Sequence, residues 1–225
     1  MQIIYEDNDI AAVNKPAGVD FDWALKERQD FFVVHRLDKD TSGIILFAKN
    51  EDAQDYLREL FKSRQIKKSY LVLVVGKVKN SSGKIELSIG RSKKTPLKRV
   101  AIGEKRGKIR EAVTEYKVLK KFEDYTFLEA FPKTGRTHQI RSHFAAIGHP
   151  VACDKLYSGK RYYCPGGISR QFLHAYSIEF KTQPPFDPLL AKEGKGAVLR
   201  LEAALPPELE KVLQEIKEND KNDKS

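Results

Sequence analysis

The stretch of residues 35–48 constrains the fold of this chain more than any other part of the sequence. Residues 35–43 are mostly polar and end in glycine, whereas residues 44–48 form an unbroken apolar run. A short apolar run that is rich in β-branched and aromatic side chains and follows turn residues is typical of a buried strand. Asp38 would then lie in a loop anchored by that strand, which is a common setting for a catalytic group. On these residues alone, an ordinary loop in which Asp38 caps backbone N–H groups is an equally good interpretation.

The size and charge of the chain narrow its class. The 225 residues, 40% of them hydrophobic, suffice for one large core, and no apolar run is long enough to span a bilayer. The 41 Lys and Arg residues outnumber the 31 Asp and Glu residues, and the net charge of +10 indicates a polyanionic partner. Nucleic acid is the first expectation and an anionic membrane surface the second. The N-terminus lacks the basic and apolar segments of a secretory signal, so we expect a cytoplasmic protein with no membrane partner.

Cysteine and histidine spacing gives little support for redox or metal chemistry. Cys153 and Cys164 are too few for a disulfide framework or a four-cysteine zinc site, and they lack the Cys-x-x-Cys spacing of a redox pair. We therefore expect two reduced, structural thiols. His138, His143 and His149 are spaced by five and six residues, whereas metal-binding helices favour pairs four residues apart, so no metal is predicted.

Hydrophobic periodicity predicts short strands and a few helices. Strands are expected at residues 3–5, 11–14, 44–48, 70–76, 112–118, 125–131, 172–180 and 197–201. The clearest helix spans residues 50–65, where Asn50 suits the N-cap and one face is apolar. Further helices are expected at residues 139–147 and from residue 206 onward, and one helical turn is expected near Trp23.

One strongly basic segment interrupts this pattern. Residues 91–110 carry nine Lys and Arg side chains against the single acid Glu104, with little periodicity. This pattern predicts a flexible hairpin or loop whose charges follow phosphate groups. The sequence shows no internal repeat and no long linker, so we expect one domain over residues 1–216 and a charged, frayed tail over residues 217–225.

Three short motifs occur in an order that is typical of one protein family. They are His-Arg-Leu-Asp at 35–38 with Thr-Ser-Gly at 41–43, Lys-Ser-Tyr at 68–70, and Gly-Arg-Thr-His-Gln-Ile-Arg at 135–141. Together with Asn-Lys-Pro-Ala-Gly at 14–18 and Leu-His-Ala at 173–175, they resemble the RluA-type pseudouridine synthases, which isomerise chosen uridines within RNA. The resemblance covers roughly residues 1–205. It implies an α+β catalytic domain around a long, largely antiparallel central sheet with flanking helices and an RNA cleft. Many members also carry a small N-terminal RNA-binding domain, which we do not expect in this chain because its motifs begin near residue 14.

The resemblance implies catalytic roles for Asp38, Arg141 and Tyr70. Asp38 would be the catalytic carboxylate, which attacks the sugar or the base or removes a proton. Arg141 would hold that carboxylate ionised and oriented, with Arg136 as the second choice. Tyr70 would stack on the target uridine after the base has left the RNA stack. The reaction exchanges a C–N bond for a C–C bond with no redox change, so neither cofactor nor metal is implied.

The resemblance also implies a set of substrate-binding residues. Arg36 looks like the arginine that fills the space vacated by the flipped base, and His35 would support the loop rather than transfer protons. The other members of the expected set are Arg136, Lys68 and Thr41. The expected substrate is ribosomal RNA, with transfer RNA as the alternative. The protein is expected to be a monomer with no obligate protein partner.

Three rival interpretations share parts of this pattern. A non-catalytic RNA-binding or ribosome-assembly protein would keep every basic feature, but Asp38 would be dispensable in it. A metal-dependent hydrolase could use the histidines and Asp154, and a chelator would then abolish its activity. A serine hydrolase centred on Ser42 lacks the Gly-x-Ser-x-Gly elbow. The intact set of Asp38, Tyr70 and Arg141 favours the synthase, since RNA binding alone needs no carboxylate facing a polyanion.

Overall fold

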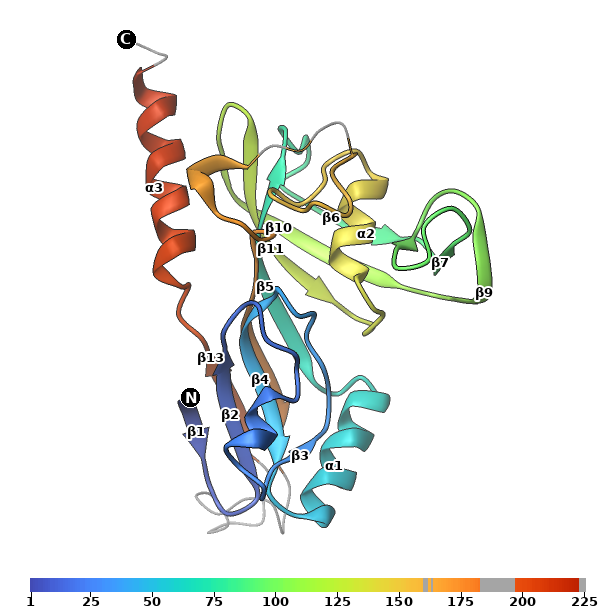
Figure 1. Cartoon of the computed structure of the whole chain (residues 1–225), viewed down its shortest axis with the longest axis vertical. Helices are drawn as coiled ribbons and strands as arrows, with labels where there is room; N and C mark the ends of the chain where they lie inside the picture. The colour runs from blue at the N-terminus through green and yellow to red at the C-terminus, as the bar shows by residue number, and fades with distance from the viewer. Residues whose placement is uncertain (160–161, 163, 183–196, 223–225) are drawn as a thin grey trace. The chain divides into compact units, whose positions relative to one another are not determined.

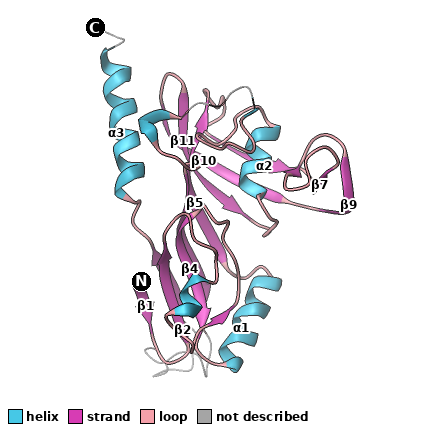
Figure 2. Cartoon of the chain, viewed as in Figure 1, coloured by secondary structure: helices cyan, strands magenta, loops and turns pink. Residues whose placement is uncertain are grey.

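The computed structural model describes residues 1–159, 162, 164–182 and 197–222, with side chains described as far as residue 220. Within these ranges the chain forms two compact units: unit 1 takes in residues 1–69 and 175–204, and unit 2 takes in residues 70–174 and 205–225. Strands predominate in both units (Figure 2). The expected α+β class with largely antiparallel strands is confirmed. The single catalytic domain over residues 1–216 stays a prediction.

Unit 1 is built around strand β4 (Ser42–Ala48), labelled in Figure 1, and every residue of this strand is buried. This strand confirms the one expected at residues 44–48. On one side β4 pairs antiparallel with β2 (Ile10–Lys15), and β2 pairs in the same way with β1 (Gln2–Glu6). On the other side of β4 the strand order continues to β12 (Leu173–Lys181). The remaining elements of unit 1 are β3 (Phe32–Val33) beside β4, β13 (Val198–Glu202) beside β12, and the short helix η1 (Trp23–Lys26).

Helix α1 (Glu51–Lys62) begins as the sequence predicts and ends earlier. The Asn50 side chain caps it by accepting a hydrogen bond from Ala53 N at 2.8 Å, and the buried side chains lie on one face. The predicted end at residue 65 is wrong because Arg64 adopts a left-handed backbone with φ of 61°. A residue in that conformation cannot continue a right-handed helix.

Unit 2 carries an antiparallel run of strands in the order β5, β11, β10 and β6. Their bounds are β5 (Lys67–Val75), β11 (Tyr125–Pro132), β10 (Val113–Lys121) and β6 (Ser82–Glu86). Alternate residues of β11 are buried, which is the period-two pattern of a strand with one face on the core. Helix α2 (Gln139–Ala146) covers this core through Ile140 and Phe144, which cluster with Val72, Val74 and Leu128.

A second apolar cluster of unit 2 brings together distant parts of the chain. Helix α3 (Pro207–Asn222) contributes Leu209, Val212 and Ile216, which pack with Leu73 and Phe172. Residues 217–222 continue this helix and residues 223–225 lie outside the described residues, so the frayed tail expected over residues 217–225 stays a prediction. Among the described helices, none combines the length and the apolar character needed to cross a membrane.

Much of the basic segment of residues 91–110 is folded as antiparallel strands, so of the two expected alternatives the hairpin is confirmed and the loop is wrong. Strands β7 (Ile89–Ser92), β8 (Arg99–Val100) and β9 (Lys105–Arg110) form a separate antiparallel sheet with β7 in the middle. Below we call this sheet the basic arm. Ile89 and Ala101 of the arm pack with Ala112 and with Ala146 at the end of α2, and Figure 1 shows the arm beside that helix. This apolar contact and the pairing of the strands both stabilise the arm.

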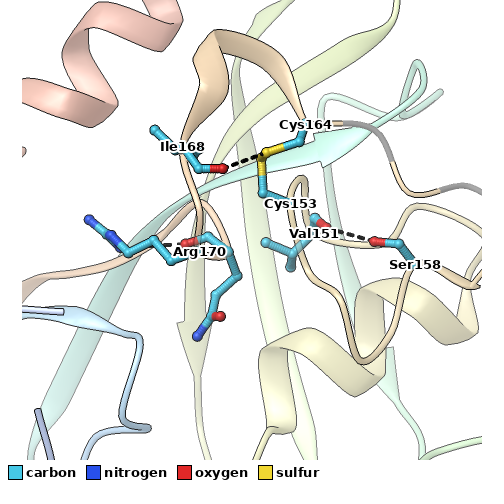
Figure 3. Close-up of a disulfide and its surroundings, with 7 residues drawn as sticks. Val151, Cys153, Ser158, Cys164, Ile168 and Arg170 are labelled. Atoms are coloured by element: carbon cyan, nitrogen blue, oxygen red, sulfur yellow. Dashed lines mark hydrogen bonds between the residues drawn. A yellow bond between two sulfur atoms is a disulfide. The ribbon is translucent and has the colours of Figure 1, made fainter. Parts of the chain in front are cut away.

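The two cysteines form a disulfide between Cys153 and Cys164, so the expected reduced thiols are wrong (Figure 3). Val151 makes an isolated bridge to Val74, and Cys153 follows it with a left-handed φ of 61°. The chain then returns to the short helix η3 (Pro165–Gly167), which brings the two Cα atoms to 4.4 Å. This separation lies within the range of natural disulfides. The eleven-residue spacing gave no hint of the pairing, because the turn at Cys153 creates it.

Candidate active site

Asp38 lies in the loop that leads into β4, and its side chain is only partly buried. The Thr41 N–H donates to the Asp38 carbonyl oxygen at 3.0 Å, which closes a turn directly after Asp38. Lys15 has no exposed surface, and its Nζ donates at 2.8–2.9 Å to the carbonyl oxygens of Pro16, Val19 and Lys39. A buried ammonium group is tolerated only where hydrogen bonds replace water. Lys15 therefore fixes the backbone next to Asp38 from the interior of unit 1.

Gly43 sets the start of β4 against β12. Its φ is 112°, and a Cβ atom built on it would lie 2.1 Å from the carbonyl oxygen of Ala175. Both the backbone angle and the close approach exclude any other residue. The Thr-Ser-Gly and Leu-His-Ala motifs are therefore neighbours in space, since Gly43 and Ala175 belong to them.

The other predicted residues of this loop differ in exposure. Arg36 is exposed, and its guanidinium lies 4.9 Å from the ring centre of Phe21, a cation–π contact. Thr41 is only 2% exposed, so its place in the turn favours a supporting role over direct contact with substrate. Of these two side chains, only Arg36 projects from the surface of the loop.

His35 supports the loop as a neutral imidazole. Its Nε2 accepts a hydrogen bond from Leu46 N at 2.8 Å, and its ring stacks on Phe61 with the ring centres 4.5 Å apart. Burial lowers the pKa of His35 to about 3, and the charge of Lys68 contributes to this shift. A neutral ring is required because a protonated imidazole has no acceptor nitrogen. These contacts suit a loop-supporting residue, and the role of His35 in the site stays a prediction.

Lys68, in β5, is also partly buried. Its ammonium lies 5.7 Å from the ring centre of Phe61, and burial lowers its pKa to about 8. Tyr70 follows two residues later and is the first residue of unit 2. It pairs in register with Ala130 of β11 and packs, partly buried, against the core cluster of α2.

Arg141 is held by an ion pair inside unit 2. The side chain is 9% exposed, and its Nε and one Nη donate to the two carboxylate oxygens of Asp154 at 2.6 and 3.0 Å. Asp154 also accepts hydrogen bonds from the backbone N–H groups of Leu156 and Tyr157. The Arg141 guanidinium lies 5.0 Å from the ring centre of Tyr157. This two-point ion pair fixes both the position and the plane of the guanidinium.

Gln139 organises the turn that precedes α2. Its side-chain oxygen accepts from Thr134 Oγ1 at 2.7 Å and from Arg136 N at 3.0 Å, and its nitrogen donates to Val113 O at 2.9 Å. The Arg136 side chain donates from Nε to the Glu111 carbonyl oxygen at 3.1 Å. The central residues of the Gly-Arg-Thr-His-Gln-Ile-Arg motif therefore have a structural function, since they position Arg136 and lead into the helix that bears Arg141.

The three histidines considered for a metal have other partners. His138 Nδ1 lies 3.1 Å from the Tyr157 hydroxyl, and His149 Nδ1 lies 2.9 Å from the Val75 carbonyl oxygen. His143 contacts Thr114 Oγ1 and the Leu87 carbonyl oxygen, each at 2.9 Å, and burial lowers its pKa. The Asp154 carboxylate forms an ion pair with Arg141. These contacts account for the histidines and Asp154 without the metal-hydrolase interpretation.

The predicted residues fall into two groups. His35, Arg36, Asp38, Thr41 and Lys68 belong to unit 1, and Tyr70, Arg136 and Arg141 belong to unit 2. The pairing of Asp38 with Arg141 stays a prediction. Sequence reasoning missed the roles of Lys15 and Tyr157. Lys15 could have been found from its place in the Asn-Lys-Pro-Ala-Gly motif, whereas nothing in the sequence marks Tyr157.

Comparison with known proteins identifies the class. Residues 9–146 match the family model described as RNA pseudouridylate synthase. The ribosomal large subunit pseudouridine synthase C of Vibrio vulnificus is 34% identical over 96% of this chain and 69% of its own length. An uncharacterized RNA pseudouridine synthase of Aquifex aeolicus is 40% identical over 71% of this chain and 57% of its own length. The chain therefore belongs to the RNA pseudouridylate synthase family. It is an RNA pseudouridine synthase, an isomerase.

A solved structure shows the same fold. Human RNA pseudouridylate synthase domain containing 1 superposes with a TM-score of 0.71 and 27% sequence identity, over 96% of this chain and 94% of that one. The α+β architecture described above is therefore the fold of this family.

Proposed function

We propose that this chain converts uridines of large-subunit ribosomal RNA to pseudouridine, with Asp38 as the catalytic carboxylate. The names of relatives from Vibrio vulnificus and Rickettsia bellii, both ribosomal large subunit pseudouridine synthase C, support ribosomal RNA over transfer RNA as the substrate. The net charge of +10 suits an RNA partner. We further propose that the protein is cytoplasmic, since bacterial ribosomal RNA lies in the cytoplasm, and that it acts as a monomer.

The anchoring of the Asp38 loop carries this proposal. The buried Lys15 ammonium donates a hydrogen bond to the carbonyl oxygen of Lys39, the residue after Asp38. The Thr41 N–H closes the turn, and Gly43 packs closely against β12. These contacts hold a partly exposed carboxylate on a rigid strand end. A catalytic group gains most from such rigidity, since fixed geometry removes part of the entropic barrier to reaction. A loop that only bound RNA would need cations here rather than an anchored carboxylate.

The other proposed site residues would act on a uracil base that has flipped out of the RNA stack. The target carbon and nitrogen atoms of a uridine are inaccessible within a stacked helix, so the nucleotide must be flipped. Tyr70 would then stack on the uracil ring, which contributes roughly 1–3 kcal/mol. The exposed Arg36 would enter the space that the base has vacated. Arg141, whose guanidinium is oriented by Asp154, would hold the Asp38 carboxylate ionised.

The reaction can be followed directly by tritium release. The hydrogen at uracil C5 is replaced when the new C–C bond forms, so RNA labelled there loses tritium with each turnover. Asp38→Asn keeps the size and shape of the side chain but removes the charge. We expect this variant to fold and bind RNA and to lose at least about 10³-fold in rate, since a covalent or proton-transfer step depends on it.

The control for this experiment is Asp40→Asn, which removes a charge from an exposed residue of the same loop. It should retain turnover. Unmodified large-subunit ribosomal RNA and transfer RNA are offered separately, and release from the former alone supports the proposed substrate. Turnover by Asp38→Asn would overturn the catalytic assignment. RNA binding without release by the wild-type protein on either RNA would favour the non-catalytic RNA-binding alternative.

A further inference from the structure

A cavity of about 430 Å³ lies in unit 2 between the basic arm and the turn that precedes α2. Cationic side chains and one hydroxyl form much of its lining: Arg91, Arg99, Lys108, Arg110, Arg136 and Thr137. Ile89 and three glycines, Gly90, Gly107 and Gly135, complete the lining. A volume of several hundred Å³ is that of a ligand pocket.

Four of the cations around this cavity, Arg91, Arg99, Lys108 and Arg110, have no carboxylate partner among the described residues. Glu104, the one acid of the basic segment, faces Lys93 at 3.7 Å. Like charges held close together repel one another and so raise the free energy of the empty site. An anion in the cavity would remove this repulsion.

The walls of the cavity are fixed in place. The Tyr157 hydroxyl accepts a hydrogen bond from Arg99 N at 2.9 Å and donates one to Arg99 O at 2.8 Å, which clamps β8. On the opposite wall, the Gln139 side chain accepts from Arg136 N at 3.0 Å. The cations therefore stand on anchored backbone, unlike the charges of a mobile loop.

The same contacts join the cavity to Arg141. The ring of Tyr157, whose hydroxyl clamps Arg99, lies beneath the Arg141 guanidinium at 5.0 Å. Arg136 and Thr137 lie in the turn that runs directly into α2, the helix of Arg141. An anion bound in the cavity would thus be held at a set position relative to Arg141 within unit 2.

We propose that this cavity is a binding site for backbone phosphates of the RNA substrate. The inference rests on the proposed function for the identity of the polyanion. Four of the five cations are arginines, whose planar forks match two phosphate oxygens at once. Phosphate contacts of this kind fix the register of a nucleic acid without reading its bases. The cavity therefore holds the RNA strand in register, while selection of the uridine belongs to other residues.

The first test is the salt dependence of RNA affinity. The variant Arg91→Gln/Arg110→Gln removes two charges from the cavity. Lys79→Gln/Lys117→Gln removes two charges from exposed positions of unit 2 that do not line it. Each phosphate contact contributes about one unit to the slope of log affinity against log salt. We expect the slope for an unmodified large-subunit ribosomal RNA transcript to fall by about two units in the cavity variant only. An equal fall in both variants would overturn the proposal, because the charges would then act through the general field of the protein.

The second test needs neither RNA nor turnover. Inorganic pyrophosphate is titrated calorimetrically into the wild-type protein and both double variants. One-to-one binding to the wild type and to the lysine variant, with at least tenfold weaker binding to the cavity variant, supports the site. Absence of pyrophosphate binding to the wild type would overturn it, as would equal or tighter binding of polyglutamate at the cavity, which would indicate an acidic protein partner. Loss of the proposed catalytic function, with pyrophosphate binding intact, would leave the cavity as a phosphate site and remove only its link to catalysis.

Discussion

His35 shows how a residue beside the proposed catalytic carboxylate can serve the fold instead of the substrate. The imidazole is only three positions from Asp38, and its Nε2 accepts the Leu46 N–H at 2.8 Å inside unit 1. This hydrogen bond and the contact with Phe61 both require the neutral ring. The residue therefore links the protonation state of the loop to the stability of β4.

The lowered pKa of His35 predicts how the stability of the protein changes in acid. The pKa of His35 is lowered from 6.5 to about 3 in the folded protein, so below pH 6.5 the unfolded chain binds a proton that the folded chain does not. The stability contributed by His35 is thus fully present above pH 6.5 and is lost as the pH falls toward 3. In urea unfolding, His35→Gln should be about 1 kcal/mol less stable than wild type at pH 7.5, because the hydrogen bond to Leu46 is weakened. The difference should shrink or reverse at pH 4.5.

Comparing wild type with His35→Gln at each pH controls for the titration of other groups. His143 also has a lowered pKa, but it is present in both proteins, so its contribution cancels in the difference. A difference between wild type and His35→Gln that stays constant from pH 7.5 to 4.5 would contradict the neutral role of His35.

At the scale of residues, the sequence motifs predict candidate site residues, and the structure shows which neighbouring residues hold them in place. Asp38 is predicted from its motif and lies in an anchored loop, and Gly43 of the accompanying Thr-Ser-Gly motif approaches β12 closely. The partner of that approach, Ala175, is more than a hundred residues away in sequence and could not be found from spacing. Asp154 was considered for a metal, whereas its carboxylate binds Arg141. A single sequence does not show which buried charges meet.

At the scale of elements, sequence pattern located the strands and helices that bury apolar side chains. Strand β4 and helix α1 were found because their burial is continuous or one-sided. Strand β9 was missed because none of its six residues is buried, so no alternation of apolar and polar residues marks it. Its fold comes from pairing with β7 and from the contact of the arm with α2. Local patterns cannot show stabilisation of this tertiary kind.

The disulfide gives a prediction at this scale. It closes a loop between the turn after Val151 and η3, and this loop contains Asp154 and Tyr157. Cross-linking residues separated by about this length stabilises a protein by roughly 2–3 kcal/mol through the entropy of the unfolded chain. Reduction by dithiothreitol should lower the free energy of unfolding by that amount, measured with guanidinium chloride. Cys164→Ser should show the reduced value with or without the reductant. A wild-type stability that does not change on verified reduction would contradict this role.

At the scale of the whole molecule, the chain passes between the two units more than once. It leaves unit 1 along β5, returns along β12 and re-enters unit 2 with α3, so each unit is built from two separate stretches of sequence. Unit 2 is completed only by the last helix, because Leu209, Val212 and Ile216 close a cluster with Leu73 and Phe172. The core beneath the strand of Tyr70 therefore depends on residues more than a hundred positions further along the chain.

The last prediction tests this dependence. Leu209 has no exposed surface, and Leu209→Ala would leave a cavity between α3 and the strands of unit 2. Substitutions of this kind cost about 2–5 kcal/mol. The control Leu213→Ala, at a partly buried position of the same helix, should cost clearly less. Both are measured by urea unfolding, with tritium release recorded at a temperature where each variant is folded. We expect Leu209→Ala to lower the unfolding midpoint and to keep most of its turnover while folded, since α3 supplies core and none of the proposed catalytic residues. An unchanged midpoint would show that unit 2 does not rely on α3, and the topological argument would then fail.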